Sequence, residues 1–419
     1  MIRKLLQSPF ARNVAVLAGG TAFAQGVGVL ALPVLTRFYT PEDFGVLGAF
    51  VALLGMISVV SALRYEIAIP LPEDDQEAAN LLVVSLICVV GISALAALLI
   101  VFFGERIAAQ FSTPILGQVL WMLPIGVLLT GAYSVFQFWA ARKKAYPHIA
   151  RTRIEQAVGG IGSQLGLGWA GVGAVGLVIG QVISNGAGFI GLARRAWTGG
   201  GDAFASVRFD GMCRTAYVYR RYPMYSSVES LANMAGLQLP LILIATLAGN
   251  KELGFLMLVM RILQAPMSLV GSAVAQVYLG QAASQLKSGR LMTFTSQTLK
   301  RLFQLGLPPM LLVAIAAPWA TPLIFGASWA RAGELIVWMA PFFFLQFLSS
   351  PIAMALHALN KQRSAAALQI SGLCLRGSSV LLFPGVAAEA FAVSSAIFYM
   401  AYLLTIIIAI KRFEVSVRI

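Results

Sequence analysis

The sequence predicts an all-α polytopic membrane protein with about twelve transmembrane helices arranged as two six-helix lobes. Hydrophobic residues make up 59% of the 419 positions and charged residues only 11%, whereas soluble domains carry roughly 25% charged residues. Uncharged runs of roughly 18 residues, the length that a helix needs to cross a bilayer, recur from end to end. A central hydrophilic stretch then divides the chain into two halves.

The first predicted span follows a short basic start that also resembles a cleavable signal. Arg3 and Lys4 precede an apolar stretch that contains the small-residue sequence 22–24. That stretch continues unbroken to Leu35, which is too long for a signal core. We therefore expect an uncleaved first helix.

Hydropathy and helix end signals divide the remaining chain into further spans. The twelve predicted ranges are 13–35, 43–63, 79–103, 115–140, 153–170, 172–193, 222–248, 252–276, 299–318, 333–356, 364–384 and 388–410. The fifth and sixth are rich in glycine and contain the spaced pairs Gly162/Gly166 and Gly176/Gly180. Such pairs allow close approach between helices. Tight packing is the favoured interpretation, and a functional hinge is the alternative.

The basic residues indicate the orientation of the chain. With the N-terminus inside, 24 of the 30 lysines and arginines fall in cytoplasmic segments and four fall in outer segments. This asymmetry satisfies the positive-inside rule and predicts that both termini are cytoplasmic. The net charge of +14 is therefore an orientation signal, and we expect no nucleic-acid partner.

A glycine-interrupted basic stretch at 194–221 predicts a cytoplasmic linker between an N-terminal lobe, 1–193, and a C-terminal lobe, 222–419. The halves also begin their second helices alike, with Pro41-Glu42-Asp43-Phe44-Gly45 and Asn250-Lys251-Glu252-Leu253-Gly254. Parallel repeats related by an axis along the membrane normal are one of the designs found in transporters.

Three ionisable residues lie well inside predicted spans, where a charge needs a partner, a wet cavity or a function. They are Arg261, Arg376 and Glu229, and each lies on a polar stripe at helical spacing. Gln264 shares the stripe of Arg261, and Asn233 shares that of Glu229. Such stripes should face the interior of a bundle, because lipid offers no hydrogen-bond partners.

The two arginines allow two interpretations. The first is a cationic, water-accessible cavity that receives an anionic head group, because a guanidinium donates paired hydrogen bonds to phosphate oxygens. The second is an internal pair of arginine with glutamate that locks helices together. We favour the cavity for Arg261 and Arg376. The choice is open for Glu229, which is also the candidate residue for ion coupling.

The segment 36–45 has the pattern of a helix start. Thr40 is the predicted N-cap, Pro41 occupies the first helical position, and Asp43 completes a capping box. This local function explains most of the motif. Arg37 remains as a candidate substrate-binding residue at the outer mouth.

The first inner loop contains Arg64 and Glu66, followed by an acidic run at 73–77. The run could be a solvated helix cap, which we favour. Alternatively, these residues could pair with basic groups of the other half in one state of a gate. Arg64 and Glu66 are therefore candidate gating residues.

No pattern in the sequence predicts an enzyme or a metal site. Paired-carboxylate, phosphate-cradling and nucleophile–base motifs are lacking, and the outer loops are mostly short. The three cysteines are far apart, and the two histidines, His148 and His357, are too few for a histidine metal site.

Several segments resemble the Wzx-type polysaccharide flippases of the multidrug/oligosaccharidyl-lipid/polysaccharide exporter superfamily. The resemblance is carried by Leu35–Gly45, Leu63–Pro70, Glu77–Asn80, Arg221–Tyr225 and Arg261–Pro266. It covers most of the chain and is most specific in the first 80 residues. It implies two six-helix lobes that form a V and alternate between inward- and outward-open states.

The resemblance also implies a function. Such a protein would move undecaprenyl-pyrophosphate-linked oligosaccharide repeat units to the outer leaflet of the bacterial cytoplasmic (inner) membrane, for O-antigen, lipopolysaccharide or exopolysaccharide synthesis. Its partners would be the polyprenyl-linked oligosaccharide, membrane lipid, and the polysaccharide polymerase with its chain-length machinery. In related lipid II flippases an arginine of the eighth helix is important, and Arg261 matches that place. We expect no cofactor, although a proton or sodium gradient could drive transport.

Two other functions compete with this one. A drug/cation antiporter of the same superfamily would prefer acidic cavity residues, whereas this chain has mainly arginines inside its spans. A membrane-embedded glycan polymerase or ligase would need a sizeable outer loop to hold donor and acceptor.

Overall fold

The computed structural model describes residues 9–111, 114–199, 201–353, 355 and 362–418. All regular secondary structure in these residues is helical, which confirms the predicted all-α fold class. Nine helices in the described residues are long and apolar enough to cross a membrane. The chain is therefore a multi-pass membrane protein.

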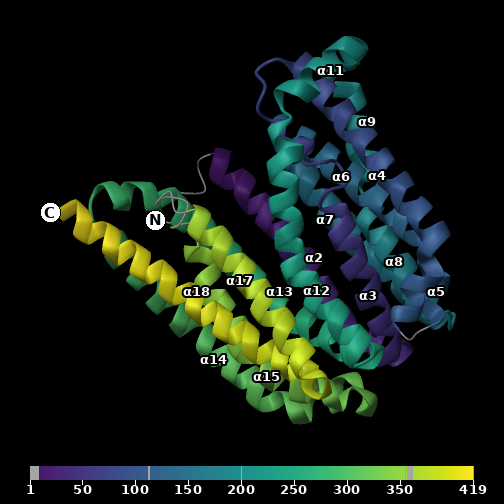
Figure 1. Cartoon of the computed structure of the whole chain (residues 1–419), viewed down its shortest axis with the longest axis vertical. Helices are drawn as coiled ribbons and strands as arrows, with labels where there is room; N and C mark the ends of the chain where they lie inside the picture. The colour runs from purple at the N-terminus through teal and green to yellow at the C-terminus, as the bar shows by residue number, and fades with distance from the viewer. Residues whose placement is uncertain (1–8, 112–113, 200, 354, 356–361, 419) are drawn as a thin grey trace. The chain divides into compact units, whose positions relative to one another are not determined.

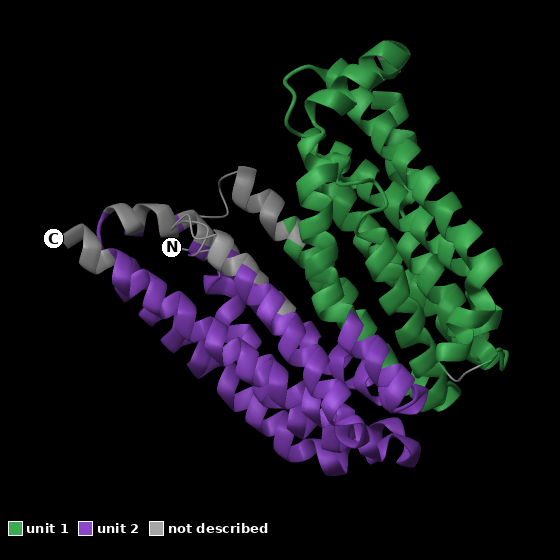
Figure 2. Cartoon of the chain, in the orientation of Figure 1, with its two compact units in different colours: residues 1–238 green, residues 239–419 purple. Residues whose placement is uncertain are grey.

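The described chain divides into two compact units, Met1–Gln238 and Leu239–Ile419 (Figure 2). Each of the twelve predicted ranges overlaps helical residues, although 115–140 and 172–193 are each divided between two helices and 222–248 crosses the boundary between the units. The helices of unit 1 are α2 (Pro9–Phe38), α3 (Pro41–Ser58), η1 (Tyr65–Ala68), α4 (Asp75–Gln110), α5 (Pro114–Val119), α6 (Met122–Arg142), α7 (Tyr146–Trp169), α8 (Ala174–Gly186), α9 (Phe189–Gly199), α10 (Gly201–Ala205), α11 (Phe209–Val218), η2 (Tyr222–Ser226) and most of α12 (Ser227–Leu247).

Unit 1 is built from pairs of long helices that share apolar faces. Helix α2 packs on α7 along its length, α7 packs on α8, and α4 packs on α6 (Figure 1). At one end of the unit, an apolar cluster joins η1 and α4 to α6 and α9, with Tyr65, Leu81, Trp139 and Leu192 among its buried members. The predicted helix start is confirmed, since Thr40 and Asp43 form a capping box at the start of α3.

The boundary between the units differs from the predicted linker. The segment 194–221 is largely helical, and its helices α10 and α11 pack on α4 inside unit 1. Long-range hydrogen bonds hold it there: the Tyr65 hydroxyl donates to the Ala216 carbonyl, and Gln76 donates to the Ser206 carbonyl. Its glycines and charges suggested a linker, but its aromatic residues supply apolar contacts to unit 1.

Unit 2 is organised around α15 (Ala330–Ile352). Its other elements are α13 (Asn250–Lys287), α14 (Leu291–Phe325), η3 (Ala327–Trp329), α17 (Gln362–Leu382), η4 (Pro384–Val386) and α18 (Ala387–Arg418). Helix α15 packs against α13, α14 and α18, and α17 packs on α18. Most of α15 is buried because it has neighbours on three sides.

The helices α7 and α8 approach closely at Gly160 and Gly180, and not at the predicted pair Gly162/Gly166. A Cβ added at Gly180 would lie 2.3 Å from Gln164 Cγ and 2.9 Å from the Gly160 carbonyl. A Cβ at Gly162 or Gly166 would meet nothing within 4 Å. The pair Gly176/Gly180 therefore lies at a close contact, whereas Gly162/Gly166 does not, because that pair lies on another face of α7.

Candidate functional site

The polar stripe of α13 brings two predicted substrate-binding residues together. Arg261 and Gln264 are three residues apart, so they lie one above the other on one face of the helix. Arg261 is half-buried, and Gln264 is exposed. Gln264 is therefore accessible to a polar ligand, and Arg261 lies one turn before it.

Gln264 lines a pocket of about 300 Å³ between α13 and α15. The other lining residues are Met267, Gly271, Ala275, Gln346, Phe347 and Ser350. Gly271 and Ala275 leave space on the side of α13. Gln346 and Ser350, four residues apart, supply polar groups on the side of α15. Both helices thus contribute polar groups to the pocket, and the small residues of α13 leave room between them.

A hydrogen bond connects this pocket with the interior of unit 2. Gln346 Nε2 donates to the Tyr399 hydroxyl of α18 at 3.0 Å. The Tyr399 ring also stacks on Phe342, with 5.4 Å between the ring centroids. The Gln346 side chain is therefore fixed by a partner that is itself held in an aromatic cluster.

Arg376, the third predicted substrate-binding residue in unit 2, is buried with 2% of its surface exposed. Its Nε donates to the Gly372 carbonyl at 3.0 Å, and its guanidinium lies 4.6 Å from the Phe398 ring centroid. A desolvated cation–π contact of this kind is worth roughly 2 kcal/mol. A Cβ at Gly372 would lie 2.9 Å from Arg376 Nη2, so glycine makes room for the guanidinium.

Arg376 reaches the pocket through its neighbours. Arg376 lies on the Phe398 ring, which packs edge to face against Tyr399 with 5.0 Å between ring centroids, and Tyr399 accepts the hydrogen bond from Gln346. The buried charge, the tyrosine and the pocket glutamine therefore form one chain of contacts within unit 2.

The remaining predicted residues lie in unit 1. Arg37 is exposed in the last turn of α2. Glu229 and Asn233 are exposed on the first turns of α12, four residues apart. These three residues are thus accessible.

Arg64 and Glu66 form an ion pair, with 3.7 Å between Arg64 Nη1 and Glu66 Oε1. Leu63 and Arg64 both adopt positive φ angles, of 49° and 63°, which strain a non-glycine backbone. Glu66 is only 5% exposed, and burial raises the pKa of its carboxyl, against opposing effects of a backbone hydrogen bond and Arg64. Within the described residues, Glu66 Oε2 and Arg64 Nε have no hydrogen-bond partner.

The acidic run of the first inner loop caps a helix and pairs within its own unit. Asp74 is the N-cap of α4 and accepts from the backbone of Gln76 and Glu77. Asp75 pairs with Arg142 at 3.0 Å and with Lys143 at 2.5 Å, both at the end of α6. These contacts agree with the favoured interpretation of a helix cap.

Gln346, Ser350 and Tyr399 were not predicted from the sequence. Gln346 and Ser350 are polar positions four residues apart in a mainly apolar run that begins with three phenylalanines. Polar positions at helical spacing could have identified the first two, but no sequence pattern pairs Gln346 with a tyrosine 53 residues later. In the residues that the structure describes, His, Cys, Asp and Glu side chains form no group of three that could hold a metal.

A family of polysaccharide biosynthesis proteins matches this chain over residues 34–334. No curated protein matches it significantly. The match runs from the end of α2 to the first turn of α15, and so includes Arg261 and Gln264.

Solved transporter structures share the fold. An inward-facing MATE-family multidrug resistance transporter of the MOP superfamily gives a TM-score of 0.71 at 15% identity, covering 93% of this chain and 95% of the other. The lipid II flippase MurJ, in an inward closed conformation, gives 0.72 at 12% identity, with 96% and 90% covered. A MOP superfamily transporter from Pyrococcus furiosus gives 0.61 at 14% identity, with 98% of each chain covered. At these identities the likeness establishes the fold alone.

Proposed function

This chain belongs to the family of polysaccharide biosynthesis proteins, and on that premise we propose that it is a flippase for lipid-linked oligosaccharides. Its substrate in this proposal is an undecaprenyl-pyrophosphate-linked repeat unit, moved from the inner to the outer leaflet of the bacterial cytoplasmic membrane. The product would supply a polymerase and its chain-length machinery for O-antigen or exopolysaccharide synthesis.

The observation that carries this proposal is the pocket between α13 and α15. Amide and hydroxyl groups of Gln264, Gln346 and Ser350 suit the hydroxyl groups of a sugar, because they both donate and accept hydrogen bonds. Arg261 lies one turn from Gln264 and suits a pyrophosphate, which a guanidinium binds through paired hydrogen bonds. One region of unit 2 thus contains groups that suit the sugar and a group that suits the pyrophosphate.

Arg376 takes a positioning role in this proposal, because its guanidinium stacks on Phe398 instead of lining the pocket. Through Tyr399 it holds Gln346 in place. Arg37 and Asn233 would contact the substrate on unit 1 from their exposed positions.

Glu229 is our candidate for coupling transport to a proton or sodium gradient, since it is an exposed carboxylate at the start of α12. Replacing it with glutamine should abolish the dependence of transport on the gradient. Transport by Glu229→Gln that still follows the gradient would remove the residue from this role.

A drug/cation antiporter is the second candidate function, and the lining of the pocket argues against it. Such a carrier needs acidic groups to attract cations, but none of the described residues that line this pocket is acidic. A membrane-embedded polymerase or ligase would instead release a longer glycan from the same substrate.

The test is translocation by the purified full-length protein in liposomes. A polyprenyl-pyrophosphate oligosaccharide placed in one leaflet should become accessible to a glycosidase on the other side, without a change in its length. Arg261→Ala should stop this movement while protein levels stay normal, and Arg290→Ala, an exposed arginine before α14, should not. Unaltered movement in Arg261→Ala, or movement of an organic cation instead, would contradict the proposal.

A further inference from the structure

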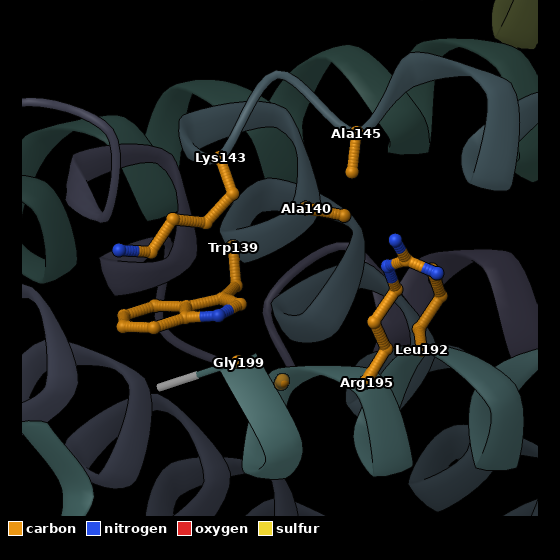
Figure 3. Close-up of a pocket in the computed structure, with 8 residues that line it drawn as sticks. Trp139, Ala140, Lys143, Ala145, Leu192, Arg195 and Gly199 are labelled. Carbon is orange, nitrogen blue, oxygen red and sulfur yellow. The ribbon is translucent and has the colours of Figure 1, made fainter. Parts of the chain in front are cut away.

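A basic pocket of about 210 Å³ lies in unit 1, apart from the residues of the proposed transport site (Figure 3). It is formed by the end of α6, the turn that follows and the helix α9. Its lining residues are Trp139, Ala140, Lys143, Ala145, Leu192, Arg195, Ala196 and Gly199. Two cations and one indole are therefore the only polar side chains among these described lining residues.

Contacts between aromatic rings hold the Trp139 side chain in place at the pocket. Trp139 is 3% exposed and packs against Phe204 of α10, with 5.1 Å between ring centroids. Phe204 in turn stacks on Trp197 of α9, with centroids 5.5 Å apart. The Lys143 ammonium lies 5.4 Å from the centroid of the Trp139 ring and pairs with Asp75. Figure 3 shows the Lys143 side chain beside the indole.

Arg195 is the cation that the protein leaves available. It is exposed on α9, and its side chain extends toward the turn that carries Ala145 (Figure 3). No carboxylate among the described residues forms an ion pair with it, in contrast to Lys143 with Asp75 and Arg151 with Glu155. The surroundings of Arg195 are positively charged. The pKa of His148 is lowered first by burial and then by the charges of Arg195 and Arg151.

The helix α9 has the character of a segment at a membrane surface. Ile190 and Trp197 are 75% and 69% exposed, while Leu192 and Ala196 are buried against the rest of unit 1. Arg194 and Arg195 are both exposed on this short helix. Exposed tryptophan and arginine side by side are typical of the interface between lipid and water. By the positive-inside rule, this basic end of unit 1 belongs on the cytoplasmic side.

We propose that this pocket binds the phosphate group of an anionic ligand at the cytoplasmic surface of the membrane, through the Arg195 guanidinium. Basic pockets between membrane helices on this side recognise phosphate-bearing head groups. The phosphate could belong to an anionic phospholipid or be free in the cytoplasm. The site is distinct from the proposed transport site, because none of the residues that line it is among those proposed to contact the translocated substrate.

The test measures binding to the full-length protein in detergent, with phosphatidylglycerol, inorganic phosphate and phosphatidylcholine as separate probes. Arg195→Gln should weaken binding of the phosphate-bearing anion about tenfold or more, the loss expected for a charge-assisted hydrogen bond. Arg194→Gln is the matched control, because Arg194 is exposed on the same helix but does not line the pocket. It should leave binding unchanged.

The probes separate the two sources of phosphate. Saturable binding of phosphatidylglycerol without binding of inorganic phosphate assigns the pocket to lipid, and binding of inorganic phosphate alone assigns it to the free ion. Either result with the Arg195 dependence supports the site. Equal loss in Arg194→Gln and Arg195→Gln, no loss in either, or equal binding of phosphatidylcholine would overturn it.

Discussion

Gln346 of α15 donates a hydrogen bond of 3.0 Å to the Tyr399 hydroxyl of α18, and this bond joins the pocket beside α13 to the interior of unit 2. The ring of Phe398 packs against Tyr399, and the buried Arg376 guanidinium lies over that ring in a cation–π contact. The pocket glutamine is therefore positioned by groups that a substrate in the pocket would not touch.

This relationship predicts coupled effects of mutation. Tyr399→Phe and Gln346→Leu should each reduce translocation in liposomes, because each removes the bond that orients the glutamine amide. The double variant should be no worse than Gln346→Leu alone, which a double-mutant cycle measures as an interaction of about 1 kcal/mol. Additive losses would show that Tyr399 acts independently of Gln346. Gln304→Leu, an exposed glutamine of α14, is the control.

Arg142 should stabilise unit 1 more than any surface ion pair. Its side chain is 10% exposed, donates to the Ile69, Pro72 and Glu73 carbonyls, and pairs with Asp75. Arg142→Met leaves these partly buried acceptors without their donor, so we expect a loss of about 2 kcal/mol in the free energy of unfolding.

The matched control for Arg142 is Arg151, whose exposed pair with Glu155 spans one helical turn. Arg151→Met should cost less than about 0.5 kcal/mol. Thermal unfolding of the detergent-solubilised protein measures both. Similar midpoints for the two variants would contradict the special role of Arg142.

Gly180 should tolerate no side chain. A Cβ there would lie 2.3 Å from Gln164 Cγ and 2.9 Å from a carbonyl of α7, so Gly180→Ala should destabilise by about 1–3 kcal/mol through overpacking. Gly162→Ala meets open space and should be neutral or stabilising, because alanine favours the helix by about 1 kcal/mol. Equal unfolding midpoints for the two variants would refute this account of the contact.

The comparison of Gly180 with Gly162 shows what the sequence could predict. The type and range of the long helices follow from apolar runs, and the start of α3 follows from Thr40 and Asp43. The spacing of glycines reveals where helices could approach, but which face meets a neighbour depends on the tertiary packing. The same limit applies to Arg376, whose aromatic partner Phe398 lies 22 residues away on another helix.

Only part of the candidate pocket could be predicted from the sequence. Arg261 and Gln264 were predicted together because three-residue spacing fixes a common helical face. Gln346 and Ser350 complete the pocket from α15, and only the packing of α15 on α13 brings them there. The segment 194–221 shows the converse, since its composition suggested a linker while its aromatic residues pack on unit 1.

Glu66 should make the stability of the protein depend on pH. Burial raises the pKa of this carboxyl in the folded state, so the folded protein binds more protons than the unfolded chain between the two pKa values. The stabilisation is complete below the unfolded pKa, about 4.3, and is lost as the pH rises through the folded pKa. Thermal unfolding midpoints should thus fall with rising pH in this range.

Glu66→Gln should flatten this dependence, because an amide does not titrate. Glu155→Gln, which replaces a carboxylate of an exposed ion pair, is the control and should retain the slope of the unaltered protein. A slope that persists in Glu66→Gln would show that another group is responsible.

The central claim is that the pocket between α13 and α15 receives the lipid-linked sugar phosphate, and site-specific photocrosslinking tests it most directly. A photoreactive residue at Met267, which lines the pocket, should form an adduct with the mass of a polyprenyl-pyrophosphate oligosaccharide. The same residue at Leu312, exposed on α14, should not. Excess unlabelled substrate should abolish the adduct at Met267, and so should Arg261→Ala. Equal labelling at both positions, or none at Met267 in a protein that still transports the lipid, would contradict the claim.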